Sequence, residues 1–235
     1  MPVIEFTTRP EIQGTFGVVA TTHWMASAVG MAVLERGGNA FDAAVAAGFT
    51  LQVVEPHLNG PSGDMPGIFY AKKDGRPRVL CAQGPAPMLA TIDHFKGLGL
   101  PTIPGAGMLA TCVPGAFGGW LALLKDYGTW SLRDCLAFAI GYARTGIPVL
   151  PNIHNTTAKV AKLFREQWPT SAEVFLDQGN VPAVGTWFRN PKLAQTYERI
   201  VEEAEAASRD REDQIEAARR IWYEGWVAEA IDDFY

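Results

Sequence analysis

The sequence predicts an α+β fold for a single globular domain, or for part of a larger one. The chain has 235 residues, of which 48% are hydrophobic and 19% charged, so it can bury a sizeable core. Two helical segments come first, two strands joined at Asp74-Gly75 follow, and helices fill most of the second half. Strands grouped together between runs of helices are typical of this fold class.

The first predicted elements are a short strand and a helix. Residues 17–22, GVVATT, are rich in β-branched side chains, which favours a strand, and Thr22 or Ser27 could cap the helix that follows. This helix should end near Arg36, because two glycines come directly after it.

A second helix is predicted to begin at Asn39 and to be buried. Its residues from Ala43 to Gly48 are alanines, a valine and a glycine, all with small side chains. Such side chains cannot fill the space between elements at the usual separation, so a neighbouring element must pack very close to them. We therefore expect a packed face that includes Ala44 and Ala47.

A β-hairpin is predicted next. GIFYAKK (67–73) and RPRVLCAQ (76–83) have strand composition, and Asp74-Gly75 between them is a two-residue turn of the type that requires positive φ. Residues 106–113 fit a third strand, and Pro114-Gly115 then opens a helix.

The second half of the chain is predicted to be mostly helical. Ser131 is a suitable N-cap, with Asp134 in the place of the capping-box glutamate. Another helix covers 152–168, whereas 169–191, rich in Pro, Gly and Asn, should form a surface excursion. The last helix carries the alternating charges of EEAEAASRDREDQIEAARR (202–220), which fit a solvated face.

Composition and charge exclude several classes of function. The formal net charge of -5 and the pI near 5.4 provide no basic field for a phosphate backbone, so nucleic acid is not an expected partner. No run of residues reaches transmembrane length, and residues 1–14 have neither the basic nor the apolar region of a secretion signal. The sequence therefore predicts a cytoplasmic protein without a membrane partner.

Cysteine and histidine usage does not indicate a disulfide or a metal site. Cys81, Cys112 and Cys135 are an odd number without CxxC spacing, so we expect buried thiols in a reducing compartment. The four histidines have no metal-ligand spacing, and Gly37-Gly38 ends a helix instead of opening a phosphate-binding loop. We expect neither a metal nor another cofactor.

Three stretches carry a family resemblance. Residues 17–60 include GVVATTH, ERGGNAFDAAVA and VVEP, residues 113–149 begin with VPG and continue through KDYG to ARTG, and residues 222–231 are WYEGWVAEAI. Together these stretches resemble the gamma-glutamyltransferase family, in its divergent branch similar to cephalosporin acylases and oxamate amidohydrolase. The resemblance runs from Gly17 to the last residue.

The resemblance implies a fold, a processing event and a chemistry. Members of this family are N-terminal-nucleophile hydrolases, in which helix layers enclose two antiparallel sheets as an αββα sandwich. A precursor cleaves itself into a large subunit and a small subunit that begins with the nucleophilic Thr, whose own α-amine acts as the base. Residues 1–235 would then be the N-terminal portion of the large subunit, in a single domain that the C-terminal small subunit completes. No catalytic nucleophile is expected in this chain.

Gln83 is the position from which the resemblance predicts specificity. Transferases of the family have Phe-Arg-Glu-x-Ala-Pro after the second strand, and their Arg grips the α-carboxylate of the γ-glutamyl substrate. This chain has Ala82-Gln83-Gly84-Pro85-Ala86-Pro87, and the shared Ala-Pro fixes the register. A neutral amide would lose an ion pair to such a carboxylate, which argues for a substrate that is not γ-glutamyl.

The segment HLNGPSGDMPGIFY (57–70) matches a glycine-rich loop that enters a core strand in the family. Asn59 and Asp64 on this loop are candidate residues near the site, although a tight connection in which His57, Asn59 and Asp64 bond backbone groups is the favoured interpretation. Glu55 and His23 have a structural interpretation, Glu55 at a helix end and His23 as a core or capping histidine.

Three functions remain open. The first is an amide hydrolase or acyltransferase of this family acting on a small non-γ-glutamyl amide, with the small subunit from the same precursor as partner and with a dimer of heterodimers as a possible assembly. The second is a true gamma-glutamyltransferase or glutathione hydrolase with a relocated carboxylate site. The third is a non-catalytic relative, which the absence of a Thr at the start of the second chain would favour. Glutathione turnover against glutaryl or oxamate turnover separates the first two.

Overall fold

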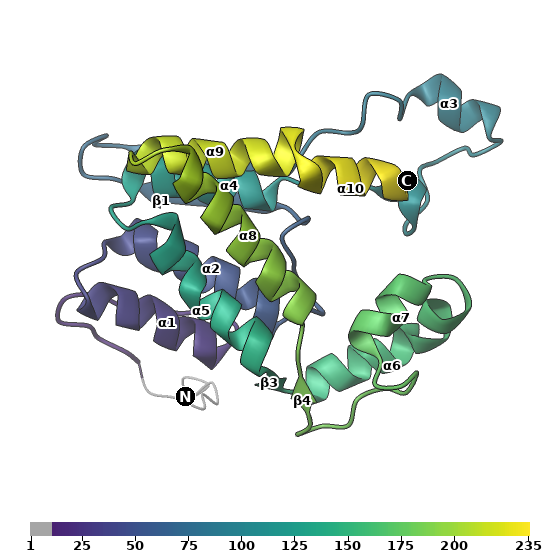
Figure 1. The fold of residues 1–235 in the computed structure, drawn as a ribbon, viewed down its shortest axis with the longest axis horizontal. Coiled ribbons are helices and arrows are strands. Elements are labelled where there is room, and N and C mark those ends of the chain that lie inside the picture. Colours follow the sequence, from purple (N-terminus) through teal and green to yellow (C-terminus); the bar gives the residue numbers. More distant parts are fainter. Residues whose placement is uncertain (1–10) are drawn as a thin grey trace, which may run out of the picture.

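A computed structural model describes residues 11–235. Residues 1–10, which belong to the segment tested for a secretion signal, lie outside the described residues. Most of the described chain is helical, with two small antiparallel sheets (Figure 1). The α+β fold class is confirmed. The elements are α1 (Trp24–Glu35), α2 (Ala40–Val54), β1 (Met65–Tyr70), β2 (Pro77–Ala82), α3 (Ile92–Gly97), the 3-10 helix η1 (Met108–Ala110), α4 (Ala116–Tyr127), α5 (Leu132–Thr145), β3 (Ile147–Pro148), α6 (Pro151–Glu166), α7 (Pro169–Phe175), β4 (Trp187–Phe188), α8 (Pro191–Ala207), α9 (Arg211–Glu224) and α10 (Trp226–Phe234).

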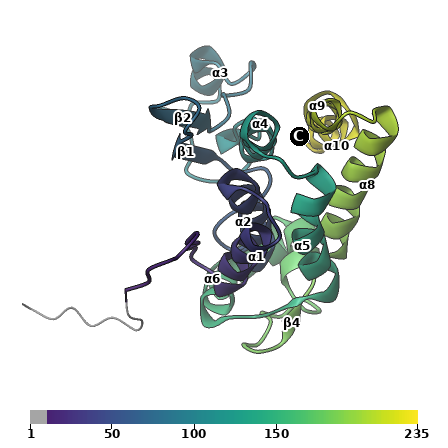
Figure 2. The same ribbon diagram turned by 90° about the vertical axis from the view of Figure 1, so that its left-hand side faces the viewer.

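Five helices form a closed circuit around the main core. α2 packs against α5, α5 against α8, α8 against α9, α9 against α4, and α4 returns to α2 (Figure 2). Aromatic side chains fill the centre: the Phe117 ring stacks on Trp222 with centroids 4.2 Å apart, and Phe49 meets Phe117 and Tyr197 edge-on. The buried Tyr197 hydroxyl donates a hydrogen bond of 2.6 Å to Gln52 Oε1, whereas the buried Nε1 atom of Trp222 has no hydrogen-bond partner among the described residues.

α2 is buried, as its composition predicts. Asn39 caps it, and Asp42 completes a capping box while also accepting hydrogen bonds from the Thr129 backbone N–H, the Thr129 hydroxyl and the Trp130 N–H. A Cβ atom at Gly48 would lie 2.4 Å from Cζ2 of Trp120, so α4 approaches as closely as was expected. The prediction for Ala44 is wrong, since Ala47 is buried but Ala44 faces solvent.

The charged stretch 202–220, predicted to lie on one helix, is divided between two helices, α8 and α9. The chain breaks after Ala207, and Asp210 caps α9 by accepting from the N–H groups of Glu212 and Asp213. Short polar residues such as Ser208 and Asp210 favour caps over helix interiors, because their side chains compete for backbone N–H groups. α10 then follows at Gly225.

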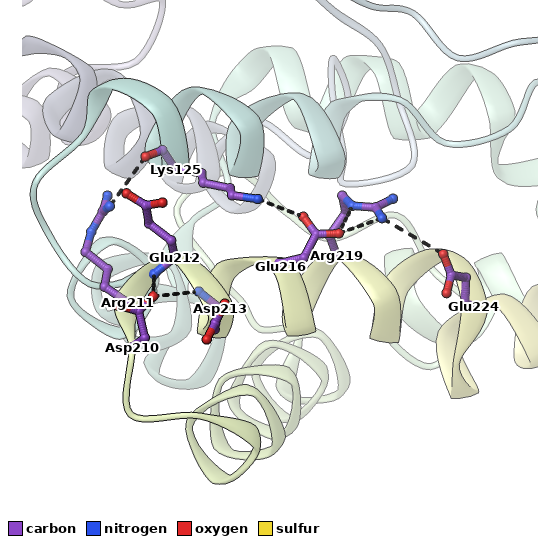
Figure 3. A network of polar contacts seen from close by, with 8 residues as sticks. All are labelled: Lys125, Asp210, Arg211, Glu212, Asp213, Glu216, Arg219 and Glu224. Atoms are coloured by element: carbon purple, nitrogen blue, oxygen red, sulfur yellow. Dashed lines mark hydrogen bonds and ion pairs between the residues drawn. The ribbon is translucent and has the colours of Figure 1, made fainter.

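Ion pairs and hydrogen bonds join α9 to the C-terminal end of α4 (Figure 3). Lys125 pairs with Glu216 at 3.2 Å, and Glu216 also pairs with Arg219. Arg211 donates to the carbonyl oxygens of Leu124 at 2.6 Å and Trp130 at 2.8 Å. A guanidinium bonded to the last carbonyls of a helix also interacts favourably with the helix dipole, so this clamp fixes where α4 ends.

The hairpin forms where it was predicted, but its turn is longer. β1 and β2 pair from Met65 opposite Ala82 to Tyr70 opposite Pro77, and residues 71–76 connect them instead of a two-residue turn. Pro77 has no N–H for a further ladder bond, which ends the pairing there. Asp74 anchors the loop by accepting from Arg78 and from the Tyr127 hydroxyl, and these bonds lower the pKa of the Asp74 carboxyl.

Two predicted strands do not form in the described chain. Residues 17–22 are irregular and 106–113 contain the 3-10 helix η1, and no described strand lies beside either segment to supply ladder hydrogen bonds. The cap of α1 is also different from the prediction: His23 Nδ1 accepts from the Met25 N–H, whereas neither Thr22 nor Ser27 caps it.

α6 and α7 project as a separate pair at the lower right of Figure 1. The prediction of a helix over 152–168 is confirmed by α6, but the excursion expected over 169–191 contains α7 and β4. β4 pairs with β3, so this segment returns to the body of the chain through a second small sheet. A smaller apolar cluster that includes Ile147, Val149, Ile153 and Phe188 packs at this base.

Cysteine burial differs from the prediction at two of three positions. Cys135 is buried, and burial raises the pKa of its thiol to about 12, whereas Cys81 and Cys112 are exposed. Cys81 lies on β2 and Cys112 lies just after η1, and most residues of both segments are exposed to solvent in the described chain. Within residues 11–235, no helix combines the length and the apolar character needed to cross a membrane.

Candidate functional site

The candidate site is built around the loop between α2 and β1. Glu55, at the C-terminal end of α2, is buried and accepts a hydrogen bond from the Thr22 hydroxyl, which confirms its structural interpretation. Asn59 Nδ2 donates to the Glu55 carbonyl at 3.4 Å, so Asn59 helps to close the end of the helix. Its side chain is otherwise exposed.

The loop is then tied to the start of α4. The Gly63 carbonyl oxygen accepts from the N–H groups of Gly115 at 3.1 Å and Ala116 at 2.9 Å, and Gly63 N–H donates to the Gly60 carbonyl. The first N–H groups of a helix have no partner within the helix, and here the loop carbonyl satisfies two of them. This arrangement fixes the backbone directly before Asp64.

The end of β2 approaches the same helix start at backbone distance. A Cβ atom at Gly84, whose φ is +74°, would lie 1.8 Å from the Val113 carbonyl oxygen, and one at Gly115 would lie 2.4 Å from the Ala82 carbonyl oxygen. The Val113 N–H also donates to the Pro85 carbonyl at 2.9 Å. Only glycine fits at these two positions without a backbone shift, so the path on either side of Gln83 is tightly determined.

Asp64 and Gln83 both lie at the open end of the hairpin. The last pair in the ladder is Met65 opposite Ala82, and Asp64 and Gln83 are the next residues outward on the two strands. Both side chains are exposed, and Gln83 Oε1 accepts a weak hydrogen bond from Cys81 Sγ at 3.4 Å. The hairpin end therefore presents one carboxylate and one amide to solvent, which can bind polar groups of a ligand. Asn59 shares the loop but makes its bond to the end of α2.

A second group of polar side chains lies where the N-terminal end of α1 meets the C-terminal end of α2. His23 is buried, and its Nε2 atom and the buried Nδ1 atom of His57 have no hydrogen-bond partner among the described residues. Burial lowers the pKa of His23; the nearby Glu55 opposes this shift and His57 adds to it. The capping role of His23 is confirmed, and a neutral imidazole suits its position.

Reasoning from the sequence missed the role of the α4 start. Gly115 and the glycines at 84 and 119 hold the hairpin against the helix, since a Cβ at Gly119 would lie 2.3 Å from Cβ of Ala82. The signal available was the spacing of glycines in VPGAFGG, which predicts close approach by another backbone but does not say which one. Only the fold supplies that partner.

Comparison with known proteins identifies the family. Residues 26–235 match the family model described as gamma-glutamyltranspeptidase. The chain is 36% identical to the oxamate amidohydrolase proenzyme of Klebsiella pneumoniae over 193 residues, which cover 79% of this chain and 36% of that protein. It also resembles proteins named glutathione hydrolase-like, acylase and cephalosporin acylase.

Solved structures share the fold. A structure of LmbA2991HD has a TM-score of 0.91 at 54% identity, covering 96% of this chain and 38% of that one. The gamma-glutamyltranspeptidase of Helicobacter pylori has a TM-score of 0.82 at 30% identity, covering 95% of this chain and 61% of that one. The chain thus spans well under half the length of the Klebsiella pneumoniae proenzyme and of LmbA2991HD. It forms part of an N-terminal-nucleophile hydrolase fold. It belongs to the gamma-glutamyltranspeptidase family.

Proposed function

We propose that residues 1–235 are the N-terminal portion of the large subunit of an amide-bond hydrolase or acyltransferase. The nucleophile is an N-terminal Thr on a small subunit that the same precursor releases by cleaving itself. The preferred substrate is a small amide whose acyl group is not γ-glutamyl. The family match over 26–235, and relatives named as amidohydrolase and acylase proenzymes, support this proposal.

Gln83 is the single observation that carries the substrate class. It stands where the resemblance to transferases would put an Arg, and it lies exposed beside a backbone path that tight glycine contacts fix. A carboxylate facing Gln83 could gain a hydrogen bond from the amide but no ion pair and no bidentate clamp. The site should therefore stabilise the transition state of free γ-glutamyl compounds only weakly.

The outer face of the hairpin supports the expected partner. Ile68 is 78% exposed and its cross-strand neighbour Val79 is 75% exposed, which leaves an apolar sheet face without a cover in the described chain. Strands or helices contributed by the small subunit would bury this face and complete the αββα sandwich. A cytoplasmic location, with a dimer of heterodimers as the assembly, belongs to the same proposal.

The experiment replaces Gln83 with Arg in the assembled enzyme. We expect kcat/KM on γ-glutamyl-p-nitroanilide to rise about ten-fold, which corresponds to about 1.4 kcal/mol of transition-state binding. The variant should lose activity on the preferred non-glutamyl amide, to be found by comparing oxamate and a set of acyl amides. A wild type that hydrolyses glutathione as fast as any non-glutamyl amide would show that another residue holds the carboxylate.

The second candidate function is γ-glutamyl transfer or glutathione hydrolysis. The likeness to the Helicobacter pylori gamma-glutamyltranspeptidase favours it. In that case a different cation would bind the substrate α-carboxylate, and Gln83→Arg would leave the ranking of substrates unchanged.

A further inference from the structure

The charge balance at the open end of the hairpin indicates what the acyl group should carry. Asp64 is exposed there, directly before the terminal ladder pair of Met65 and Ala82, and Gln83 follows that pair on the other strand. Among the described residues Asp64 takes part in no ion pair and its carboxylate accepts no hydrogen bond from a side chain. Its charge is therefore available to a ligand.

The cations of the hairpin, Lys72, Lys73, Arg76 and Arg78, lie at the opposite end, in the connection over 71–76 or at the start of β2. Arg78 is bound to Asp74, and Lys73 is bound to the Asp126 carbonyl and lies over the Tyr127 ring. Arg78 and Gln83, the residue directly after β2, are five residues apart, which corresponds to about 17 Å at the rise of a β-strand. This exceeds a Debye length of about 8 Å at physiological ionic strength, so these cations do not neutralise Asp64.

The start of α4, which packs against the open end, does not supply a cation either. α4 begins there with two N–H groups that are already bonded to the Gly63 carbonyl. Farther along α4 and on α9, Lys125 and Arg219 both pair with Glu216. Arg220, also on α9, is exposed and takes part in no ion pair among the described residues, but no contact joins it to the hairpin end. The described part of the site therefore combines one negative charge with one neutral amide.

We infer that Asp64 is a specificity-determining residue, and that the acyl group of the substrate carries a cation or a hydrogen-bond donor where γ-glutamyl and glutaryl groups carry a carboxylate. This inference rests on the proposed amide hydrolysis at the same site. Asp64 attracts an ammonium or amide N–H group and repels a carboxylate, while Gln83 offers its carbonyl oxygen or its NH₂ group to either side of that donor.

The test uses three p-nitroanilides of nearly equal length, with 5-aminopentanoyl, pentanoyl and glutaryl acyl groups, and the enzyme assembled from the full precursor. In the wild type, kcat/KM should fall in that order. The measured quantity is the ratio of the aminopentanoyl to the glutaryl value, because a ratio taken on one preparation cancels any loss of folded enzyme.

Asp64→Asn should reduce this ratio about ten-fold, about three-fold for each charged substrate, as expected for one charge acting across several ångströms of partly hydrated space. Raising the salt concentration to about 0.5 M should reduce the wild-type ratio in the same direction, and should affect the variant much less. Asp93→Asn, at an exposed position in the first turn of the projecting helix α3, makes the same charge change and should leave the ratio unchanged (Figure 1).

Two results would overturn the inference while leaving the proposed function intact. One is an enzyme that hydrolyses these amides with a ratio that Asp64→Asn does not change by more than two-fold. The other is a wild type that prefers the glutaryl substrate. Absence of hydrolysis for every amide tested would instead refute the proposed function, and the inference would fall with it.

Discussion

Gly48 offers a sharp test of how closely α2 and α4 pack. A Cβ atom there would lie 2.4, 2.6 and 2.8 Å from three ring atoms of Trp120, so Gly48→Ala requires the indole to move by about 1 Å. Replacing glycine by alanine inside a helix normally stabilises it by about 1 kcal/mol. Overpacking costs about 1–3 kcal/mol, so we expect a net loss of up to about 2 kcal/mol.

Gly141→Ala is the matched control, because Gly141 lies inside α5 and a Cβ there would meet no atom within 4 Å. This variant should gain about 1 kcal/mol from helix propensity alone. The assay is the urea dependence of the free energy of unfolding for the assembled protein and both variants. The difference between the variants isolates the packing cost and should be about 1–3 kcal/mol. If Gly48→Ala is as stable as Gly141→Ala, the close approach of Trp120 is refuted.

Three further outcomes are expected. Ala47→Leu should lower the free energy of unfolding by about 1–3 kcal/mol, whereas Ala44→Leu at the solvent-facing position should change it by less than about 0.5 kcal/mol; equal effects in thermal melts would contradict the burial of α2. Burial lowers the pKa of His23 below that of an unfolded histidine, so the stability that His23 contributes is complete above about pH 6.5 and is lost as the pH falls. His23→Asn keeps a capping oxygen but removes the titrating group. In denaturation series at several pH values, this variant should lose free energy of unfolding less steeply toward acid pH, by up to one proton in the slope. Arg211→Met should lower the free energy of unfolding by about 1–3 kcal/mol, because it leaves helix-end carbonyls without their donor. Arg209→Met, at an exposed position without an ion pair in the described chain, should leave it nearly unchanged. If calorimetry finds no loss of stability for Arg211→Met, the clamp is contradicted.

Local signals in the sequence predict most of the helices. Asn39 and Ser131 cap helices as their positions indicate, and the glycines at 37 and 146 follow helix ends. These features depend on residues within one or two turns, so the sequence alone contains the cause. The break at Ser208 has an equally local cause. It was not predicted, because the alternating charges continue on both sides of it.

Non-local features could not be predicted in the same way. Residues 17–22 and 106–113 have strand composition, but a strand needs a partner, and composition does not provide one. The placement of Asp64 and Gln83 just beyond the terminal pair of Met65 and Ala82 depends on the hairpin register, which the longer turn over 71–76 sets. The tie between Gly63 and the start of α4 joins residues far apart in the chain, so no short motif could have indicated it.

The attachment of α4 at both of its ends has a consequence for how this protein tolerates change. Twelve residues give this helix a length of about 18 Å, with the Arg211 clamp at one end and the loop before Asp64 at the other. Because α4 is rigid and is held at both ends, a small displacement of one end moves the other end as well. Under the proposed function, surface substitutions near Arg211 that are chosen only to improve heat resistance should therefore shift substrate preference as well, although they lie a full helix length from the hairpin end.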